Sequence, residues 1–222
     1  MTPTTSSFRE AIAPLWRDNL ALAQLLGLCP LLAVTTTVVN GVALGLASAA
    51  VVVIASTAMS ALKRALKPAA RLPVALLILA TLVTVVDLFS EALFYDLHGK
   101  LGIFIPLIVV NSGLLAHAEN VASRRSVGFT LLSALATGFG FLLAFVALGA
   151  FREIVGHGTL LSDIELLAGE SYRGMRLDLG VGGVLVAILP PGAFFGLGLL
   201  LALRNRLTAT KPQDRSSSGT PR

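Results

Sequence analysis

The chain is poor in cysteine, in aromatic residues and in charge. Its 222 residues include one cysteine, Cys29. A single thiol excludes an intramolecular disulfide framework and a metal centre held by several thiolates of this chain alone. Aromatic residues make up 6% and charged residues 13% of the sequence, whereas a typical soluble domain has about 25% charged residues. This composition argues against a cytosolic globular protein.

Several enzyme motifs are missing as well. The sequence has no Gly-x-Ser-x-Gly elbow of hydrolases and no dinucleotide fingerprint or phosphate loop. Its formal net charge is +5, but the basic residues stand in short segments between apolar runs, which favours membrane orientation over nucleic-acid binding. The beginning of the chain lacks the pattern of a cleaved signal peptide, so we expect none.

Long uncharged runs dominate what is present. Uncharged stretches of 44, 18, 26 and 25 residues begin after Asp18, Lys100, Arg125 and Asp178. A helix needs about 20 apolar residues to cross the hydrocarbon core of a bilayer. The longest run is divided by the turn dipeptide Asn40-Gly41, and a further span is expected to begin at Pro73. The sequence therefore predicts an all-α, polytopic membrane protein with six transmembrane helices, over residues 20–39, 42–62, 73–93, 101–118, 127–151 and 179–203.

The basic residues predict the orientation of these helices. If the N-terminus lies in the cytoplasm, 13 of the 17 basic residues fall in inside segments, and the outside segments hold Lys100, Arg152, Arg173 and Arg176. The positive-inside rule then places both termini in the cytoplasm, and the acidic segment 152–178 outside. The tail after Leu207 is rich in Ser, Lys, Arg and Pro, a composition typical of disorder.

Two related segments indicate an internal repeat. The segments 26–35 and 101–111 both contain Leu-Gly, a short apolar gap and Pro-Leu, and their prolines lie 76 positions apart. Three predicted spans separate the two segments, so the second copy enters the membrane from the opposite side. This is the pattern of an inverted 3+3 repeat. The predicted organisation is an N-terminal cytoplasmic segment, two three-helix repeats and a cytoplasmic tail, over residues 1–18, 19–98, 99–206 and 207–222.

Each related segment is expected to break its helix. Gly27 and Pro30 lie in the first predicted span, and Gly102 and Pro106 lie in the fourth. Proline removes a backbone donor and clashes with the preceding turn. In a bilayer, such a break survives only where protein or a polar cavity satisfies it. We therefore expect Pro30 and Pro106 to face each other inside the bundle, although simple proline kinks without a function would give the same sequence pattern.

The same segments resemble a known family, the paired membrane subunits of Rnf-type ion-translocating oxidoreductases and of sodium-pumping NADH:quinone reductases. The segments 25–34 and 102–109 are similar to its first-helix and fourth-helix signatures. Three further stretches match in order, covering residues 152–154, 158–160 and 189–194. The resemblance spans roughly residues 15–205.

This resemblance implies a six-helix subunit that pairs with a homologous sister subunit of opposite topology in the bacterial inner membrane. Each partner of the family contributes two cysteines, and the four hold a [2Fe-2S] cluster near the middle of the membrane. Electrons from NADH or ferredoxin cross it, coupled to the transport of Na⁺ or H⁺. The flavin and NADH sites belong to other subunits of the complex, and this chain is not expected to catalyse a reaction alone.

The sequence departs from the family at the second cysteine position. Cys29 matches the first ligand, but Ser112 stands where the second cysteine is expected. A serine oxygen is harder than sulfur and its proton is more difficult to remove. Three interpretations remain open: a cluster with one oxygen ligand, a cluster completed by another group, or no cluster.

Three further polar residues have alternative interpretations. Asp87 and Glu91 share one face of the third predicted span through their i,i+4 spacing. Asp87 is a candidate for an ion path, or it lies at a solvated helix end. His117 is either a metal ligand or a side chain that snorkels or caps near the cytoplasmic end of the fourth span.

Taken together, these features predict a subunit of an Rnf-type electron-transport complex that couples electron transfer to ion translocation. The rival hypothesis is a secondary transporter-like or redox-silent structural subunit, since inverted repeats with broken helices also occur in transporters. Transporters usually place polar groups at the breaks, and here only Cys29, Thr35, Asn111 and Ser112 are found there.

Overall fold

The computed structural model describes residues 25–119, 125–160, 177–178 and 183–208 of the chain. The predictions for the segment 1–18, for the start of the first span, for most of the acidic outside segment and for the tail after Thr208 lie outside the described residues. The elements in chain order are α2 (Leu28–Val34), α3 (Val38–Leu62), η1 (Pro68–Ala70), α4 (Arg71–Leu93), α5 (Tyr95–Leu101), η2 (Ile105–Ile108), α6 (Ser112–His117), α7 (Val127–His157), β1 (Thr159–Leu160), β2 (Leu177–Asp178), α9 (Leu185–Ile188) and α10 (Pro190–Thr208). The two short strands pair in antiparallel fashion, and the rest of the described fold is helical.

Three helices are long and apolar enough to cross a bilayer. They are α3, η1 with α4, and α7, with mean hydropathy of 2.3, 2.4 and 2.2 in their most apolar windows. The segments Tyr95–Leu101 and Ile105–His117, bent by 62° at the residues between them, form a fourth span if they are taken together. The predicted all-helical membrane architecture is confirmed, with three or four candidate spans among the described residues.

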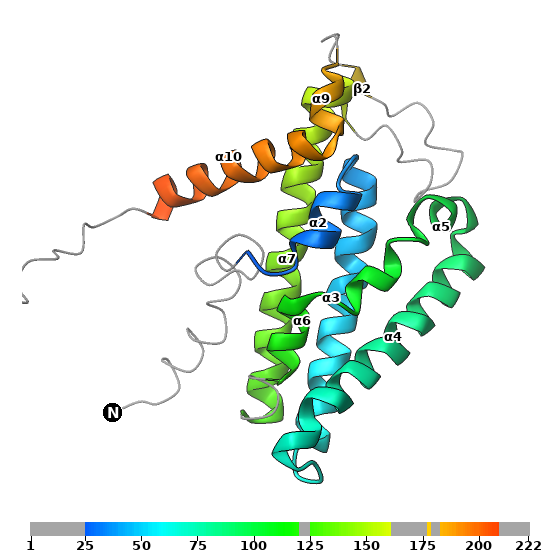
Figure 1. Cartoon of the computed structure of the whole chain (residues 1–222), viewed down its shortest axis with the longest axis vertical. Coiled ribbons are helices and arrows are strands. Elements are labelled where there is room, and N and C mark those ends of the chain that lie inside the picture. Colours follow the sequence, from blue (N-terminus) through cyan, green and yellow to red (C-terminus); the bar gives the residue numbers. More distant parts are fainter. Residues whose placement is uncertain (1–24, 120–124, 161–176, 179–182, 209–222) are drawn as a thin grey trace, which may run out of the picture.

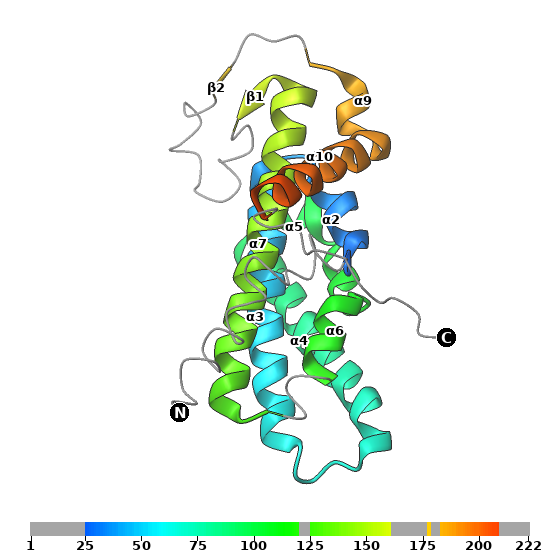
Figure 2. The same cartoon turned by 90° about the vertical axis from the view of Figure 1, so that its left-hand side faces the viewer.

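Helices α3 and α7 form the axis of the molecule (Figures 1 and 2). They run antiparallel and pack closely because small residues line their interface. A Cβ atom added to Gly138 of α7 would lie 2.9 Å from Cβ of Ala49 on α3, and one added to Gly41 would lie 2.8 Å from the carbonyl oxygen of Phe145. These contacts also set the register, in which the numbers of facing residues add up to about 187.

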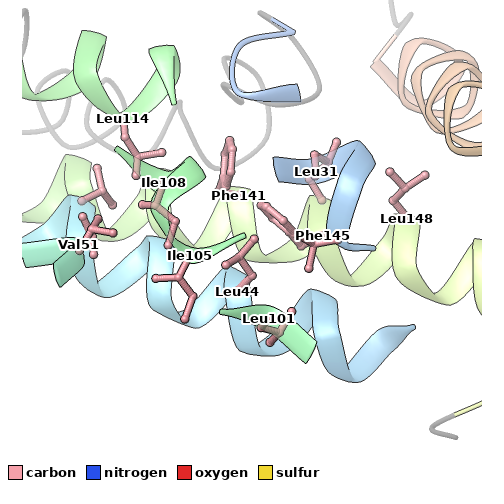
Figure 3. Close-up of a cluster of buried hydrophobic side chains, with 14 of the residues drawn as sticks. Leu31, Leu44, Val51, Leu101, Ile105, Ile108, Leu114, Phe141, Phe145 and Leu148 are labelled. Atoms are coloured by element: carbon pink, nitrogen blue, oxygen red, sulfur yellow. The ribbon is translucent and has the colours of Figure 1, made fainter. Parts of the chain in front are cut away.

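The apolar core lies at the end of this axis that is near α2. Phe141 and Phe145 of α7 pack against each other with ring centroids 5.2 Å apart, and Leu31, Leu44 and Leu148 surround them (Figure 3). All five side chains are fully or almost fully buried. Nearer the start of α7, the same interface contains hydroxyl side chains instead of aromatic rings, namely Thr130, Ser133 and Thr137.

Helix α4 packs on α3 only in part and diverges from it toward α5 (Figure 1). Its buried residues are Ala75, Leu79 and Val83. An apolar cavity of about 390 Å³ lies farther along, lined by residues that include Leu44, Phe89 and Leu97. The opposite face of α4 exposes large apolar side chains, Leu77, Val85 and Leu88 among them, as suits a helix in contact with lipid or another subunit.

The boundary between the first two predicted spans is not at Asn40-Gly41. Helix α3 already begins at Val38, and Thr37 is its N-cap, whose hydroxyl accepts a hydrogen bond from the backbone nitrogen of Asn40 at 3.3 Å. Threonine is a favourable N-cap. The chain therefore turns at residues 35–37, and Asn40-Gly41 lies within the first helical turn.

The last predicted span is divided. Helix α9 ends at Ile188, Leu189 is extended with ψ 161°, and α10 begins at Pro190. A residue before proline is disfavoured in the helical conformation, while proline itself is well suited to the first turn of a new helix. Helix α10 crosses the end of α7 at a wide angle (Figure 2), and Gly196 makes room there for the ring of Phe151.

Candidate functional site

The first break in the chain is at Gly27. This residue has φ +76° and precedes the seven-residue helix α2. The left-handed conformation favours glycine, because a Cβ atom there is strained. Cys29 and Pro30 are the second and third residues of α2, so the missing donor of Pro30 falls in the first turn, where backbone donors have no helical partner. Pro30 is buried and the Cys29 side chain is exposed.

The second break follows α5. The chain turns at residues 102–104, and Pro106 is the second residue of the short η2 helix. Helix α6 then begins at Ser112. Its N-cap is Asn111, whose Oδ1 accepts hydrogen bonds from the backbone nitrogens of Gly113 at 3.0 Å and Leu114 at 3.4 Å. The side chain of Ser112 is exposed.

The two breaks meet at Gly27 and Asn111. A Cβ atom added to Gly27 would overlap with the side-chain amide of Asn111, 2.7 Å from its Nδ2, and Asn111 is only 2% exposed. The absence of a side chain at residue 27 therefore allows the two segments to touch. Cys29 and Ser112, two residues and one residue beyond this contact, are both exposed beside it. The prediction that Pro30 and Pro106 face each other inside the bundle is wrong, because Pro106 is exposed. The asparagine N-cap provides the contact instead.

A buried arginine anchors the other end of α2. Arg152 of α7 is 2% exposed, although the sequence placed it in an outside segment. Its guanidinium donates to the carbonyl oxygens of Leu32 (3.0 Å), Ala187 (3.2 Å) and Ile188. It also donates to the hydroxyl of Thr35 at 3.3 Å. The last carbonyls of α2 and α9 lack partners within their helices and carry the negative end of the helix dipole, so a cation there is favourable.

The neighbouring residue Glu153 serves the opposite kind of helix end. It is fully buried, and its Oε2 accepts a hydrogen bond from the backbone nitrogen of Val38 at 2.8 Å. Val38 is the first residue of α3, where a negative charge is favourable. Arg152 and Glu153 thus join the ends of α2, α3 and α9 to α7. Sequence reasoning noted this pair only as part of a family-like stretch, and its position beside an apolar run was the signal for a buried role.

Asp87 lies within α4, which continues to Leu93. Its Oδ1 is 3.6 Å from Nδ1 of His98 on α5, and both side chains are partly exposed. The ring of His98 lies against Gly102, since a Cβ atom there would be 2.9 Å from Nε2. The second break therefore has a carboxylate and an imidazole beside it. Glu91 is exposed.

His117 is buried between two serines, and this placement differs from the predicted snorkelling or capping role. It is the last residue of α6 and is 5% exposed. Its Nδ1 is 3.0 Å from the hydroxyl of Ser56 on α3, and its Nε2 is 3.2 Å from the hydroxyl of Ser133 on α7. The imidazole therefore joins the two axial helices near the positively charged end of the bundle.

Within the part of the chain that the structure describes, no three His, Cys, Asp or Glu side chains are grouped so that they could hold a metal ion. The donors beside the Gly27–Asn111 contact are one thiol and one hydroxyl. A site for a two-iron cluster needs four ligands. These two residues fit such a site only as one half of it, with the remaining ligands supplied from outside this chain.

Known proteins resemble the chain over nearly its whole length. Residues 7–201 match the family described as "Rnf-Nqr subunit, membrane protein". Among curated proteins, the chain is 48% identical to a subunit of the ion-translocating oxidoreductase complex of Thioalkalivibrio sulfidiphilus, covering 91% of this chain and 90% of the relative. The protein of the same name from Haemophilus ducreyi is 46% identical, covering 86% and 85%. That from Rhodobacter capsulatus is 44% identical, covering 89% and 82%. The chain therefore belongs to the Rnf-Nqr family of membrane subunits.

Proposed function

We propose that this chain is a membrane subunit of an Rnf-type complex and that it couples electron transfer to the translocation of Na⁺ or H⁺ across the bacterial inner membrane. It does so as six spans in an inverted 3+3 repeat, with both termini in the cytoplasm. Family membership supports the general role, since the relatives are named as subunits of an ion-translocating oxidoreductase complex. The chain does not catalyse the reaction alone, because flavin and NADH belong to other subunits.

The observation that carries this proposal is the pairing of Cys29 and Ser112. Each lies in the first turn of a short helix, each side chain is exposed, and the Gly27–Asn111 contact holds the two segments together. Two ligand candidates from distant parts of the sequence are thus presented side by side at the surface of an apolar bundle. A second protein chain covering this surface would complete the donor set.

The group that these donors suit is a [2Fe-2S] cluster shared with a homologous subunit. Such a cluster supplies one-electron transfer between redox partners that are too far apart to react directly. Cys29 would hold it through its thiolate, and Ser112 would hold it through an alkoxide. Because oxygen is a harder donor than sulfur, a serine ligand favours the oxidised cluster and lowers its reduction potential.

Asp87 is the proposed ion-path residue of this chain. A carboxylate within a membrane-spanning segment is costly unless it has a function or a partner. Asp87 lies beside His98 at the second break, so an ion or proton bound there is close to the segment that carries Ser112.

One observation favours the rival hypothesis, a redox-silent or transporter-like subunit. Ser112 removes the second thiol, and a serine at the start of α6 can also act as a simple polar residue at a helix end. In that case, its replacement changes local packing and leaves iron binding unaffected.

The two hypotheses are separated by measuring iron content and reduction potential of the purified complex. Wild type is compared with Ser112→Cys and Cys29→Ala, each isolated with its partner subunits. We expect Ser112→Cys to retain more iron and to be easier to reduce, because sulfur is softer and loses its proton more readily. Cys29→Ala is expected to lose iron. Equal iron content and potential in all three proteins would contradict a cluster on this chain.

A further inference from the structure

The end of the α3–α7 interface with Lys63 and Arg125 is polar. We call it the hydroxyl seam, and its members are Ser48, Ser56 and Ser60 of α3, His117 of α6, and Thr130, Ser133 and Thr137 of α7. All seven side chains are 5% exposed or less. From Ser48 to Ser60, the seam extends over twelve residues of α3, which is about 18 Å at the rise of an α-helix.

The seam residues face one another across the interface. Thr130, Ser133 and Thr137 follow the i, i+3, i+7 spacing of one helix face, and the same face continues into the buried residues Phe141 and Leu148. In the register set by the close glycine contacts, residues 130 and 133 lie opposite residues 54–57 of α3. His117 enters from α6 at this level and bonds to both helices.

Hydroxyl groups in the seam behave differently from those elsewhere in the bundle. Thr57, Thr81 and Thr84 donate to the carbonyl oxygen four residues earlier in their own helices, at 2.7, 2.9 and 2.9 Å. This bond is the usual way to satisfy a hydroxyl in an apolar helix. The hydroxyls of Ser48, Ser60, Thr130 and Thr137 are buried and make no such bond.

These four hydroxyls need a hydrogen-bond partner inside a membrane-spanning interface. A buried polar group without one costs free energy, and in hydrocarbon no bulk water compensates. The side-chain nitrogen of Asn111, at the second break, is also buried and unpartnered. Small polar molecules between α3 and α7 would satisfy this row of groups, and water is the molecule that both donates to and accepts from hydroxyls.

Charged groups lie only at the ends of this interface. In the described sequence of α3, of α4 as far as Val86 and of α7 as far as Phe151, no side chain after the first residue of α4 carries a charge. The groups nearest to His117 are at the ends of these elements, namely Lys63, Arg71, Glu119 and Arg125. Lys63 donates there to the carbonyl oxygen of Arg125. His117 is thus the one titratable side chain among the seam residues.

We propose that the hydroxyl seam is a proton path, in which ordered water and the ring of His117 carry protons between the Lys63–Arg125 end and the break at Asn111. The inference rests on the proposed function, which leaves the ion open, and it assigns that ion as H⁺. In one transfer, the unprotonated ring nitrogen accepts a proton from one neighbouring serine, while the other nitrogen releases its proton to the second serine. Water at each end supplies and removes these protons, and exchange of the two tautomers returns the ring to its starting form.

The first test uses the whole complex reconstituted in liposomes that contain a pH-sensitive dye, in sodium-free medium, with a reduced electron donor added outside. We expect electron transfer in the wild type to change the internal pH. Proton movement per electron should fall at least about tenfold in His117→Gln, because a positioned acid–base group has been lost. Thr130→Val should also reduce it. The matched control Thr57→Val removes a hydroxyl that bonds its own helix and should stay close to wild type.

Two results would overturn the proposal and leave the proposed function intact. One is a His117→Gln complex that moves protons as the wild type does. The other is a wild-type complex that moves Na⁺ but changes internal pH only when sodium is present. If the complex transfers no electrons, the proposed function itself fails.

A second measurement keeps the seam testable when variants do not assemble or electron transfer is absent. Solid-state NMR of the ¹⁵N-histidine-labelled wild-type complex in lipid reports on the ring nitrogens of His117. We expect magnetisation transfer from water to this ring and exchange between its tautomers. A dry ring fixed in one tautomer would overturn the proposal.

Discussion

At the scale of single residues, the largest difference between sequence and structure concerns Arg152. Counting basic residues places it in an outside segment, because a charge at the end of an apolar run usually marks the start of a loop. The structure buries it instead, since helix α7 continues to His157 and three carbonyl oxygens meet the guanidinium. These acceptors come from residues 32, 187 and 188, and a pattern local to residue 152 contains no information about them.

We predict that Arg152→Gln strongly destabilises the protein. The amide of glutamine cannot reach all of the carbonyls, and Glu153 would remain buried without a neighbouring cation. Breaking a buried charged group of this kind typically costs about 3–5 kcal/mol. The apparent melting temperature in detergent should therefore fall by several degrees, at roughly 2–4 °C per kcal/mol. Arg64→Gln, at an exposed position after α3, is the control, and an equal effect of both substitutions would contradict the role of Arg152.

At the scale of the elements, the sequence predicts well where long apolar helices end. The predicted ends at Leu62 and Leu93 and the predicted start at Val127 agree with α3, α4 and α7. The short elements are harder to predict. Thr37 begins α3 before the Asn40-Gly41 dipeptide, and Leu189 separates α9 from α10. Both boundaries depend on one or two residues that select between helix and turn, whereas the long helices depend on composition averaged over many residues.

The candidate site was predicted in part from the two proline-containing segments. Their proximity was expected, but the contact between them was assigned to the wrong pair of residues. Asn111 caps α6 and fills the space that Gly27 leaves free. Nothing in a single sequence shows that these positions touch, because 84 residues separate them.

We predict that Gly27→Ala separates the two breaks. Alanine at φ +76° costs about 1–2 kcal/mol, and its Cβ atom would overlap with Oδ1 of Asn111. Thermal stability and recovery of the assembled complex should both fall. Gly128→Ala is the matched control, since a Cβ atom there meets nothing within 4 Å.

A double substitution distinguishes overlap from backbone strain. Asn111→Ser keeps an oxygen that can cap α6 on a shorter side chain. If the overlap matters, Gly27→Ala combined with Asn111→Ser should be less damaging than the sum of the two single substitutions. Simple additivity would show that the contact between the breaks is not important for stability.

At the scale of the whole molecule, the described bundle has a large apolar surface. Exposed side chains include Leu77, Leu88 and Phe89 of α4 and Phe194 and Phe195 of α10. Lipid covers part of such a surface. The exposed Cys29 and Ser112 suggest that a protein covers another part, because lipid offers no ligands to a thiol or a hydroxyl.

The topology is predicted to be six spans with both termini in the cytoplasm. Reporter fusions after Lys67, Arg125 and Leu207 should report the cytoplasm, and fusions after Lys100 and Gly169 should report the periplasm. The expectation follows from the excess of basic residues in the inside segments. A cytoplasmic fusion after Lys100 would exclude the inverted repeat of two three-helix units.

We predict that the chain needs a homologous subunit for stable accumulation. Coexpression with that subunit should raise the yield of monodisperse protein in detergent, and affinity purification of one chain should recover the other. Coexpression with an unrelated six-span protein is the control. A chain that is equally abundant and monodisperse when expressed alone would argue against obligate pairing.

The position of Arg152 has a consequence for the order in which the protein is made. Its hydrogen-bond acceptors at Leu32 and Thr35 precede it in the chain, whereas those at Ala187 and Ile188 follow it by 35 and 36 residues. When α7 leaves the ribosome, the guanidinium therefore has only part of its partners. An arginine with incomplete partners is expensive inside a bilayer, so the end of α7 enters its final position only after α9 has been synthesised. Until then, insertion of this helix is reversible, and the arrival of α9 completes it.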